Sequence, residues 1–243
     1  MRYAIISDIH ANYEAFTAVL NDIKSLNIDE TYCLGDIIGY GPNPNECVDL
    51  ILKNKIKSIK GNHERALSDK KYLENFNIIA ANVINWTTKE LTPENKKILE
   101  DLPNYMFIEE KFVLVHGSFK KPDKYLVENE DIIEEVEELK EAGIKIEFFG
   151  HTHISRIIVD EKKPIKPKGN EKIKLNEKNI YLINPGSVGQ PREADSRASY
   201  LIFDSVSLTI EYRKVHYNIE ETIKKIKSVG LPEFLANRLR FGI

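Results

Sequence analysis

Polar residues with the chemistry of metal ligands follow several short apolar runs of this chain. Five of the six histidines stand at such places, each next to aspartate, glycine or asparagine. The clusters, in chain order, are Asp8-Ile9-His10, Gly35-Asp36, Gly61-Asn62-His63-Glu64, His116-Gly117 and Gly150-His151-Thr152-His153. Open α/β sheets build their sites where parallel strands end, so we expect these side chains to meet at one sheet edge.

Each cluster taken alone has an ordinary structural explanation. Asp8 can serve as a charge at a helix N-terminus, and Asn62 is a good N-cap for a following helix. His151 and His153 alone indicate at most a weak site for a single metal ion. The interpretation changes because the clusters stand at successive strand ends, a combination typical of an active site.

Asp8, Asp36, Asn62 and the five histidines together offer two carboxylates, one carboxamide and five imidazoles. Such mixed donors suit manganese, iron, zinc, cobalt or nickel, and they do not favour a lone magnesium or calcium ion. There are more donors than one ion can use, and two divalent ions about 3.5–4 Å apart would engage them. One shared carboxylate must then bridge the two ions.

The elements that have to position these residues alternate between strands and helices in the first half of the chain. Apolar runs at residues 3–7, 31–34 and 56–60 predict buried strands, and helical periodicity follows Asn12 and Pro44. Further strands are expected at residues 112–115 and 146–149, with an acidic helix over residues 131–142 between them. This alternation predicts an α/β fold with a mainly parallel sheet.

Two later regions depart from that alternation. Residues 71–104 have a wholly helical pattern, with a new helix start at Thr92-Pro93-Glu94, and we interpret them as a cap-like insert that shapes the substrate pocket. After residue 153, four apolar runs follow without helices between them, which predicts an antiparallel layer that completes a second sheet; they are residues 154–159, 180–183, 200–203 and 208–212. The lysine-rich residues 161–178 are expected to form a solvated hairpin loop, with a phosphate-attracting rim as the alternative. The chain is helical again from Asn218.

The composition is that of a soluble globular domain, and we expect residues 1–243 to form one. Hydrophobic residues make up 42% and charged residues 30% of the chain, and the net charge of −3 argues against a dedicated nucleic-acid binder. Cys33 and Cys47 lack metal-ligand spacing and are expected to pack in the core. No apolar run is long enough for a signal peptide or a membrane span, so a cytoplasmic protein is predicted.

The five clusters resemble, as a set, the motifs of the calcineurin-like metallophosphoesterase family. The resemblance implies a four-layer α/β/β/α sandwich of two mixed β-sheets, with the metal ions at one end. It implies that Asp36 bridges two ions, of which one is held by Asp8, His10 and His153 and the other by Asn62, His116 and His151. A hydroxide between the ions would attack phosphorus. His63 would protonate the leaving oxygen, with the orientation of a ligand as its alternative role.

Two further segments resemble a narrower group, the small prokaryotic phosphoesterases labelled YfcE-like or diadenosine-tetraphosphatase-like. These segments are residues 35–44 and residues 184–192, the latter followed by Arg197-Ala198-Ser199-Tyr200. The Asp-Arg pair that follows the second motif in serine/threonine phosphatases is absent, which argues against a protein phosphatase. Arg192 and Arg197 are candidates for a phosphate clamp, and surface ion pairs are the alternative for both.

The resulting functional hypothesis is a two-metal phosphodiesterase or phosphatase that acts on a small or nucleotide-like phosphate ester. A dinucleoside polyphosphate hydrolase is the alternative within the enzymes. A non-catalytic scaffold that binds partner proteins is the alternative from another class, and the complete set of motifs argues against it. Oligomerisation is possible, whereas nucleic acid and membranes are not expected as partners.

Overall fold

The computed structural model describes residues 1–69 and 71–243, and within them two β-sheets form the centre of the molecule. The first sheet has the strand order β3 (Lys57–Ser58), β2 (Glu30–Cys33), β1 (Arg2–Ile6), β10 (Ala198–Asp204), β11 (Thr209–Val215), β8 (Lys172–Lys174). The second sheet has the order β4 (Tyr105–Ile108), β5 (Phe112–Val115), β6 (Ile146–Phe148), β9 (Tyr181–Asn184), β7 (Arg156–Val159). Strands β1, β2 and β3 run parallel, as do β5, β6 and β9, so both sheets are mixed.

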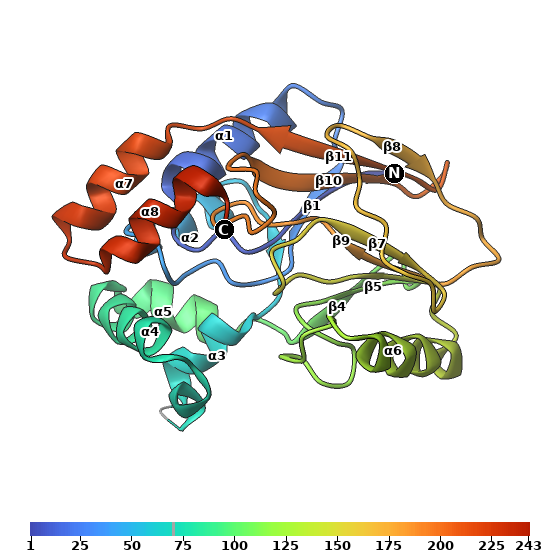
Figure 1. Cartoon of the computed structure of the whole chain (residues 1–243), viewed down its shortest axis with the longest axis horizontal. Helices are drawn as coiled ribbons and strands as arrows, with labels where there is room; N and C mark the ends of the chain where they lie inside the picture. Colours follow the sequence, from blue (N-terminus) through green and yellow to red (C-terminus); the bar gives the residue numbers. More distant parts are fainter. Residues whose placement is uncertain (70) are drawn as a thin grey trace.

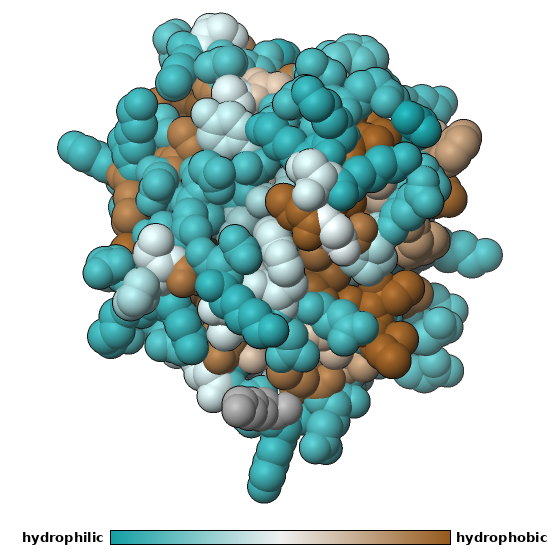
Figure 2. Space-filling view, turned by 90° about the vertical axis from the view of Figure 1, so that its left-hand side faces the viewer, coloured by the Kyte–Doolittle hydropathy of each residue, from teal (hydrophilic) through white to brown (hydrophobic). Residues whose placement is uncertain are grey.

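Helices cover the outer faces of the two sheets and one end of the molecule. In Figure 1, α1 lies along the first sheet and α6 along the second, while α7, α8 and α3–α5 gather on the left. The helices are α1 (Tyr13–Lys24), α2 (Pro44–Lys53), α3 (Asn62–Ser68), α4 (Ile78–Glu90), α5 (Pro93–Glu100), α6 (Asn129–Ala142), α7 (Ile219–Ser228) and α8 (Glu233–Phe241), with a 3₁₀ turn over Tyr72–Asn75. Figure 2 shows that the left-hand side is mostly hydrophilic, with hydrophobic residues in a limited area right of centre.

The alternation of side chains along β1 explains the layers. Tyr3 and Ile5 pack into the core between the sheets, which also contains Phe148 of the second sheet. Ala4 and Ile6 point the other way and pack in a second core with α1 and α2. A third core joins the outer face of the second sheet to α6. The predicted α/β/β/α sandwich is therefore confirmed.

Local signals set the helix boundaries near the sheet edge as expected. The Asn12 side chain accepts a hydrogen bond from the Ala15 N–H at 3.1 Å and caps α1, and Pro44 occupies the first turn of α2. Gly143 ends α6 in the left-handed conformation, with φ 71°. Cys33 and Cys47 are both buried and free.

The prediction that the strands after residue 153 form one antiparallel layer is wrong, because these strands are divided between the two sheets. Strands β7 and β9 belong to the second sheet, and β9 is parallel to β6; β10 and β11 instead continue the first sheet beyond β1. Strand β10 pairs with the free edge of β1, and its residues are buried on both faces apart from Asp204. The pairing partner of a strand depends on which edge remains open, and that information is not in the strand's own sequence.

Two local expectations need correction in part, and one strand was not expected. Residues 161–178 are not wholly a loop, because β8 pairs with β11 and its Ile173 packs against the core between the sheets. Strand β4, an antiparallel neighbour of β5, carried no expectation from the sequence. In the segment 71–104, a short 3₁₀ turn over Tyr72–Asn75 precedes α4 in place of an α-helix. The expected helix start is confirmed, because Thr92 caps α5 and Pro93 is its first residue.

Candidate metal centre

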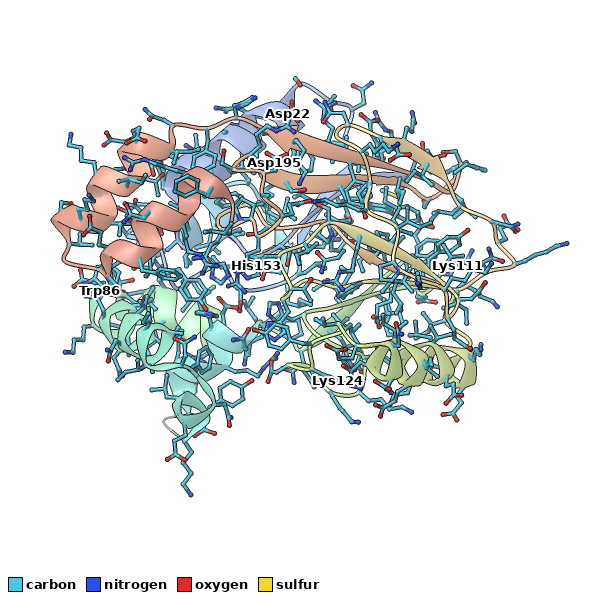
Figure 3. The ribbon with its side chains drawn as sticks, viewed as in Figure 1. Asp22, Trp86, Lys111, Lys124, His153 and Asp195 are labelled. Carbon is cyan, nitrogen blue, oxygen red and sulfur yellow. The ribbon has the colours of Figure 1, made fainter. Side chains whose placement is uncertain are left out.

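The strand ends bring seven expected ligands together at one edge of the sandwich. Two groups of side chains have donor atoms within 4.8 Å of one another: Asp8, His10, Asp36 and His153 form one, and Asp36, His116 and His151 the other. Asp36 belongs to both groups, as expected of a bridging ligand. In Figure 3, His153 lies in the middle of the molecule with several ring nitrogens close to it.

In the first group, hydrogen bonds to the backbone decide which ring nitrogens carry protons. His10 Nδ1 lies 3.1 Å from the carbonyl oxygen of Ile38, and His153 Nδ1 lies 2.6 Å from that of Gln190. Each Nδ1 must therefore donate a proton, which leaves a lone pair on each Nε2. These two Nε2 atoms face each other at 3.1 Å, and Asp8 Oδ1 lies 3.4 Å from His153 Nε2. Ring nitrogens and a carboxylate oxygen that face one another in this way are suited to share a bound cation.

In the second group, too, a backbone carbonyl oxygen binds one ring nitrogen of a histidine. His116 Nδ1 lies 2.8 Å from the Leu34 carbonyl oxygen, so Nδ1 holds a proton and Nε2 is the nitrogen that a metal ion could bind in place of a proton. That Nε2 lies 3.0 Å from Asn62 Oδ1, 3.2 Å from His151 Nδ1 and 3.4 Å from Asp36 Oδ2. The carboxamide of Asn62 thus completes the second group, as the sequence motif implied.

Backbone strain and orphaned polar atoms occur at the same residues. Five of the expected ligands adopt the left-handed region, with φ 54° at Asp8, 49° at His10, 53° at Asp36, 64° at His151 and 60° at His153. Such conformations are unfavourable for residues other than glycine and cluster at functional sites. Asp8 Oδ1 and His151 Nε2 are also buried without a hydrogen-bond partner. The two groups are therefore candidate ligand sets for divalent metal ions, and Asp36 belongs to both.

Burial controls the protonation of these groups. It lowers the pKa of His10, His151 and His153 well below the ordinary value, which keeps the imidazoles neutral as metal ligands have to be. Burial also opposes a charged His116, but the Asp36 carboxylate outweighs it and raises the pKa of His116 to about 9. The Asp36 carboxylate therefore interacts strongly with the His116 ring.

His63 lies beside Asp36 and faces a cavity of about 160 Å³. Its backbone N–H donates to Asp36 Oδ1 at 3.0 Å, and its ring Nε2 lies 3.9 Å from Asp36 Oδ2. The ring packs against Tyr40 and, at a right angle, against Phe76, with centroid distances of 4.7 and 5.3 Å. Its Nδ1 is buried without a hydrogen-bond partner, and burial lowers the pKa of His63 to about 4.

Glu64 is a site residue to which the sequence analysis gave no role. Its buried carboxylate accepts hydrogen bonds from four backbone N–H groups: those of Asp36 and Gly61 at 2.8 Å, Ile37 at 2.9 Å and Ile38 at 3.2 Å. It therefore joins the loop after β2 to the start of α3 and fixes Asp36 between the two groups. The acidic residue three positions after Gly61 was the available signal, because this is the spacing of a helix-capping glutamate.

The two arginines considered for a phosphate clamp lie in different surroundings. Arg192 lines the cavity with His63, and its guanidinium lies 5.9 Å from the centroid of the Tyr40 ring. Arg197 instead pairs with Asp195, with Nη2 2.7 Å from Oδ2, and Figure 3 draws Asp195 well apart from His153. Arg197 thus has the surface ion pair that was its alternative role.

Three aromatic side chains lie along the rim of the cavity. The ring of Tyr125 stacks on His151 with a centroid distance of 3.7 Å and is 49% exposed. Tyr72 and Phe76, which contact each other at 6.0 Å between centroids, come from the segment before α4. The cavity is therefore lined both by buried candidate metal ligands and by more exposed aromatic rings.

Comparisons with known proteins agree with this geometry. Residues 1–207 match the model of the calcineurin-like phosphoesterase superfamily domain. The chain is 43% identical to an uncharacterised protein of Methanocaldococcus jannaschii, over 98% of this chain and 97% of that protein. A metallophosphoesterase from Sphaerobacter thermophilus has a similar structure, with a TM-score of 0.87, 36% identity and coverage of 100% of this chain and 99% of that one.

A more distant structure shares the fold alone. It is described as a proposed diadenosine tetraphosphatase, with a TM-score of 0.53, 15% identity and coverage of 89% of this chain and 95% of that one. Within residues 1–69 and 71–243, no helix combines the length and apolar character needed to cross a bilayer. The resemblance stated from the motifs is confirmed: the chain belongs to the calcineurin-like phosphoesterase superfamily.

Proposed function

We propose that this protein hydrolyses phosphate esters at a centre of two divalent metal ions. The observation that carries the proposal is the set of facing lone pairs, because His10 Nε2 and His153 Nε2 lie 3.1 Å apart with both Nδ1 atoms committed to carbonyl groups. Two bound ions would activate water near neutral pH and neutralise phosphoryl oxygens. Asp8, His10 and His153 would hold one ion, Asn62, His116 and His151 the other, with Asp36 shared.

His63 is the proposed proton donor to the leaving oxygen. It faces the cavity, and its side chain is not required as a ligand. Burial keeps its pKa at about 4, and the negative charge of a bound phosphate would raise that pKa, so the proton is taken up when substrate arrives. A role in orienting Asp36 is the alternative, since the His63 N–H already binds that carboxylate.

Arg192 is the proposed clamp for the phosphate, and Arg197 is left out because it is paired with Asp195. Arg192 lines the cavity, and its Nε is buried without a hydrogen-bond partner. A guanidinium with unused donors at such a place suits a phosphate oxygen. The expected effect of Arg192→Met is a raised KM with metal binding retained.

The cavity favours a small or nucleotide-like substrate. Its volume of about 160 Å³ is below the roughly 300–1,000 Å³ of sites that enclose drug-sized ligands, so it would enclose the phosphate and leave the rest on the rim. The rings of Tyr72, Phe76 and Tyr125 on that rim can stack on a base. This supports a dinucleoside polyphosphate as the second candidate substrate, and it supports the role of residues 71–104 as a cap.

The test begins with metal-stripped protein. Bis-p-nitrophenyl phosphate, p-nitrophenyl phosphate and dinucleoside polyphosphates are then assayed with manganese, nickel, magnesium and zinc added one at a time. We expect turnover with at least one transition metal. No turnover with any of them would favour the non-catalytic scaffold. Manganese as the metal in the cell, a cytoplasmic location and an oligomeric form stay predictions.

Two histidine variants separate catalysis from metal binding. His63→Ala should keep its metals and lose a factor of about 100–10,000 in rate, the usual contribution of general acid–base catalysis. His216→Ala is the matched control, because His216 is the sixth histidine and is exposed outside the site. Unchanged turnover by His63→Ala would reject the acid assignment and leave the metal centre intact.

A further inference from the structure

Gln190 connects a proposed metal ligand to the proposed phosphate clamp. Its backbone carbonyl oxygen lies 2.6 Å from His153 Nδ1, and its side-chain Oε1 accepts a hydrogen bond from Arg192 Nη2 at 2.9 Å. The side chain is 2% exposed, so both contacts are shielded from water. One residue therefore contacts both the imidazole of His153 and the guanidinium of Arg192.

The loop that carries Gln190 is firmly held against the first motif. The Gln190 N–H donates to Ser187 Oγ at 2.8 Å, and that hydroxyl donates to the Asp8 carbonyl oxygen at 2.9 Å. The Gly189 N–H also donates to the Asp8 carbonyl oxygen, at 2.9 Å. A Cβ atom at Gly189 would lie 1.8 Å from the Ile9 carbonyl oxygen, so only glycine permits this approach. The position of Gln190 is thus set by the loop.

A second arginine, from the C-terminal helix α8, reaches the same amide. Arg238 Nη1 donates to Gln190 Oε1 at 2.9 Å, the same distance as Arg192 Nη2. The shared acceptor is uncharged, so it neutralises neither guanidinium. Burial, followed by the charge of Arg192, lowers the pKa of Arg238 to about 10. Two like charges are therefore held beside one oxygen at the edge of the proposed active site.

We propose that Arg238 is a positioning residue, which acts through the Gln190 amide to hold Arg192 in its phosphate-binding orientation. Arg238 occupies one lone pair of Gln190 Oε1 and fixes the amide, and its charge repels the Arg192 guanidinium toward the cavity. An arginine that is fixed before the anion arrives loses less side-chain entropy on binding. The inference rests on the proposed function only in taking phosphate as the anion that Arg192 binds.

A double-mutant cycle on the manganese-loaded protein tests the proposal. Inorganic phosphate is the probe, and its affinity is measured by titration calorimetry for wild type, Arg192→Met, Arg238→Met and the double variant. We expect Arg192→Met to weaken phosphate binding most and Arg238→Met to weaken it about three- to tenfold, a coupling usual for residues in one network. The double variant should bind phosphate no more weakly than Arg192→Met alone. Arg238→Lys should recover part of the loss.

Arg240→Met is the matched control, because Arg240 is exposed on the same helix and pairs with Glu220 at 2.7 Å. It should bind phosphate as wild type does. Manganese affinity and the urea midpoint are measured for every variant. Weaker manganese binding or a lower midpoint that accounts for the whole effect of Arg238→Met would indicate a merely structural role and overturn the proposal.

Additive losses in the double variant would also overturn it, because Arg238 would then act on phosphate without Arg192. The same holds if wild type does not bind phosphate or if Arg238→Met binds it unchanged. Failure of the proposed function looks different. In that case no ester is hydrolysed with any metal, while the phosphate affinities of the cycle can still be read.

Discussion

Replacement of Glu64 by glutamine tests how Asp36 is held between the two ligand groups. The Glu64 carboxylate receives four N–H donors, two on each oxygen, from the loop after β2 and from Gly61. It is fully buried, so water cannot replace these hydrogen bonds. Glu64→Gln keeps the shape of the side chain and turns one of the two acceptors into a donor. Two backbone N–H groups then face an NH₂ group.

The magnitude follows from those contacts. A hydrogen bond to a charged group contributes about 1.5–3 kcal/mol, and a buried donor without a partner costs about 1–3 kcal/mol. The loss of charge removes part of the desolvation penalty of the carboxylate, which offsets some of the damage. We therefore expect the free energy of unfolding to fall by about 3–5 kcal/mol, which a domain with a total of about 5–15 kcal/mol can survive.

The assay is urea denaturation in the presence of chelator, followed by calorimetric titration with manganese. Because Asp36 is displaced, manganese affinity should fall about 10- to 100-fold, as is usual when a partner of a metal ligand is changed. Glu46→Gln is the control: Glu46 is exposed and accepts a single hydrogen bond from Asn43 at 2.9 Å. Its expected effect is below about 0.5 kcal/mol. A Glu64→Gln protein as stable as that control, with wild-type manganese affinity, would refute the reasoning.

Further predictions concern other parts of the molecule. A Cβ atom at Gly39, where φ is 90°, would lie 2.1 Å from His63 Nδ1, so Gly39→Ala should displace the ring and lower turnover about 100-fold; manganese titration should show retained metal, and unchanged turnover would contradict the expectation. Manganese at a hundred times its Kd should raise Tm by about 5–10 °C, and Asp36→Ala should abolish that shift in a thermal scan. Burial, with the charge of Glu135, raises the pKa of Glu147 well above 4.5, so the folded protein keeps a proton that the unfolded chain releases. The free energy of unfolding therefore decreases as pH rises above 4.5. Urea midpoints measured over a pH series should fall less for Glu147→Gln than for wild type. Parallel pH profiles for the two proteins would contradict this.

The sequence by itself determined the strand ends and the ligands that follow them. Asp8 and Asp36 follow apolar strands of the first sheet and His116 follows one of the second, and the ends of these strands meet at one edge of the sandwich. The helix starts at Asn12 and Pro44 were equally readable, because capping and proline effects act within a few residues. The chemistry of the donor residues alone also implied a shared carboxylate. Local signals were sufficient for these features because the information lies within a few positions of each residue.

Only the tertiary structure decided which strands pair with each other and which side chains the arginines contact. Strand β10 pairs with β1, although the two are far apart in the chain, because β1 had an open edge in the first sheet. Arg192 reaches the cavity while Arg197 pairs with Asp195, and Arg238 arrives from α8 to meet Gln190. The β1–β10 and Gln190–Arg238 contacts join residues far apart in the chain, whereas Arg197 pairs with a residue only two positions away. Contacts between distant residues depend on how the whole chain packs, and no periodicity or residue spacing in the sequence indicates them.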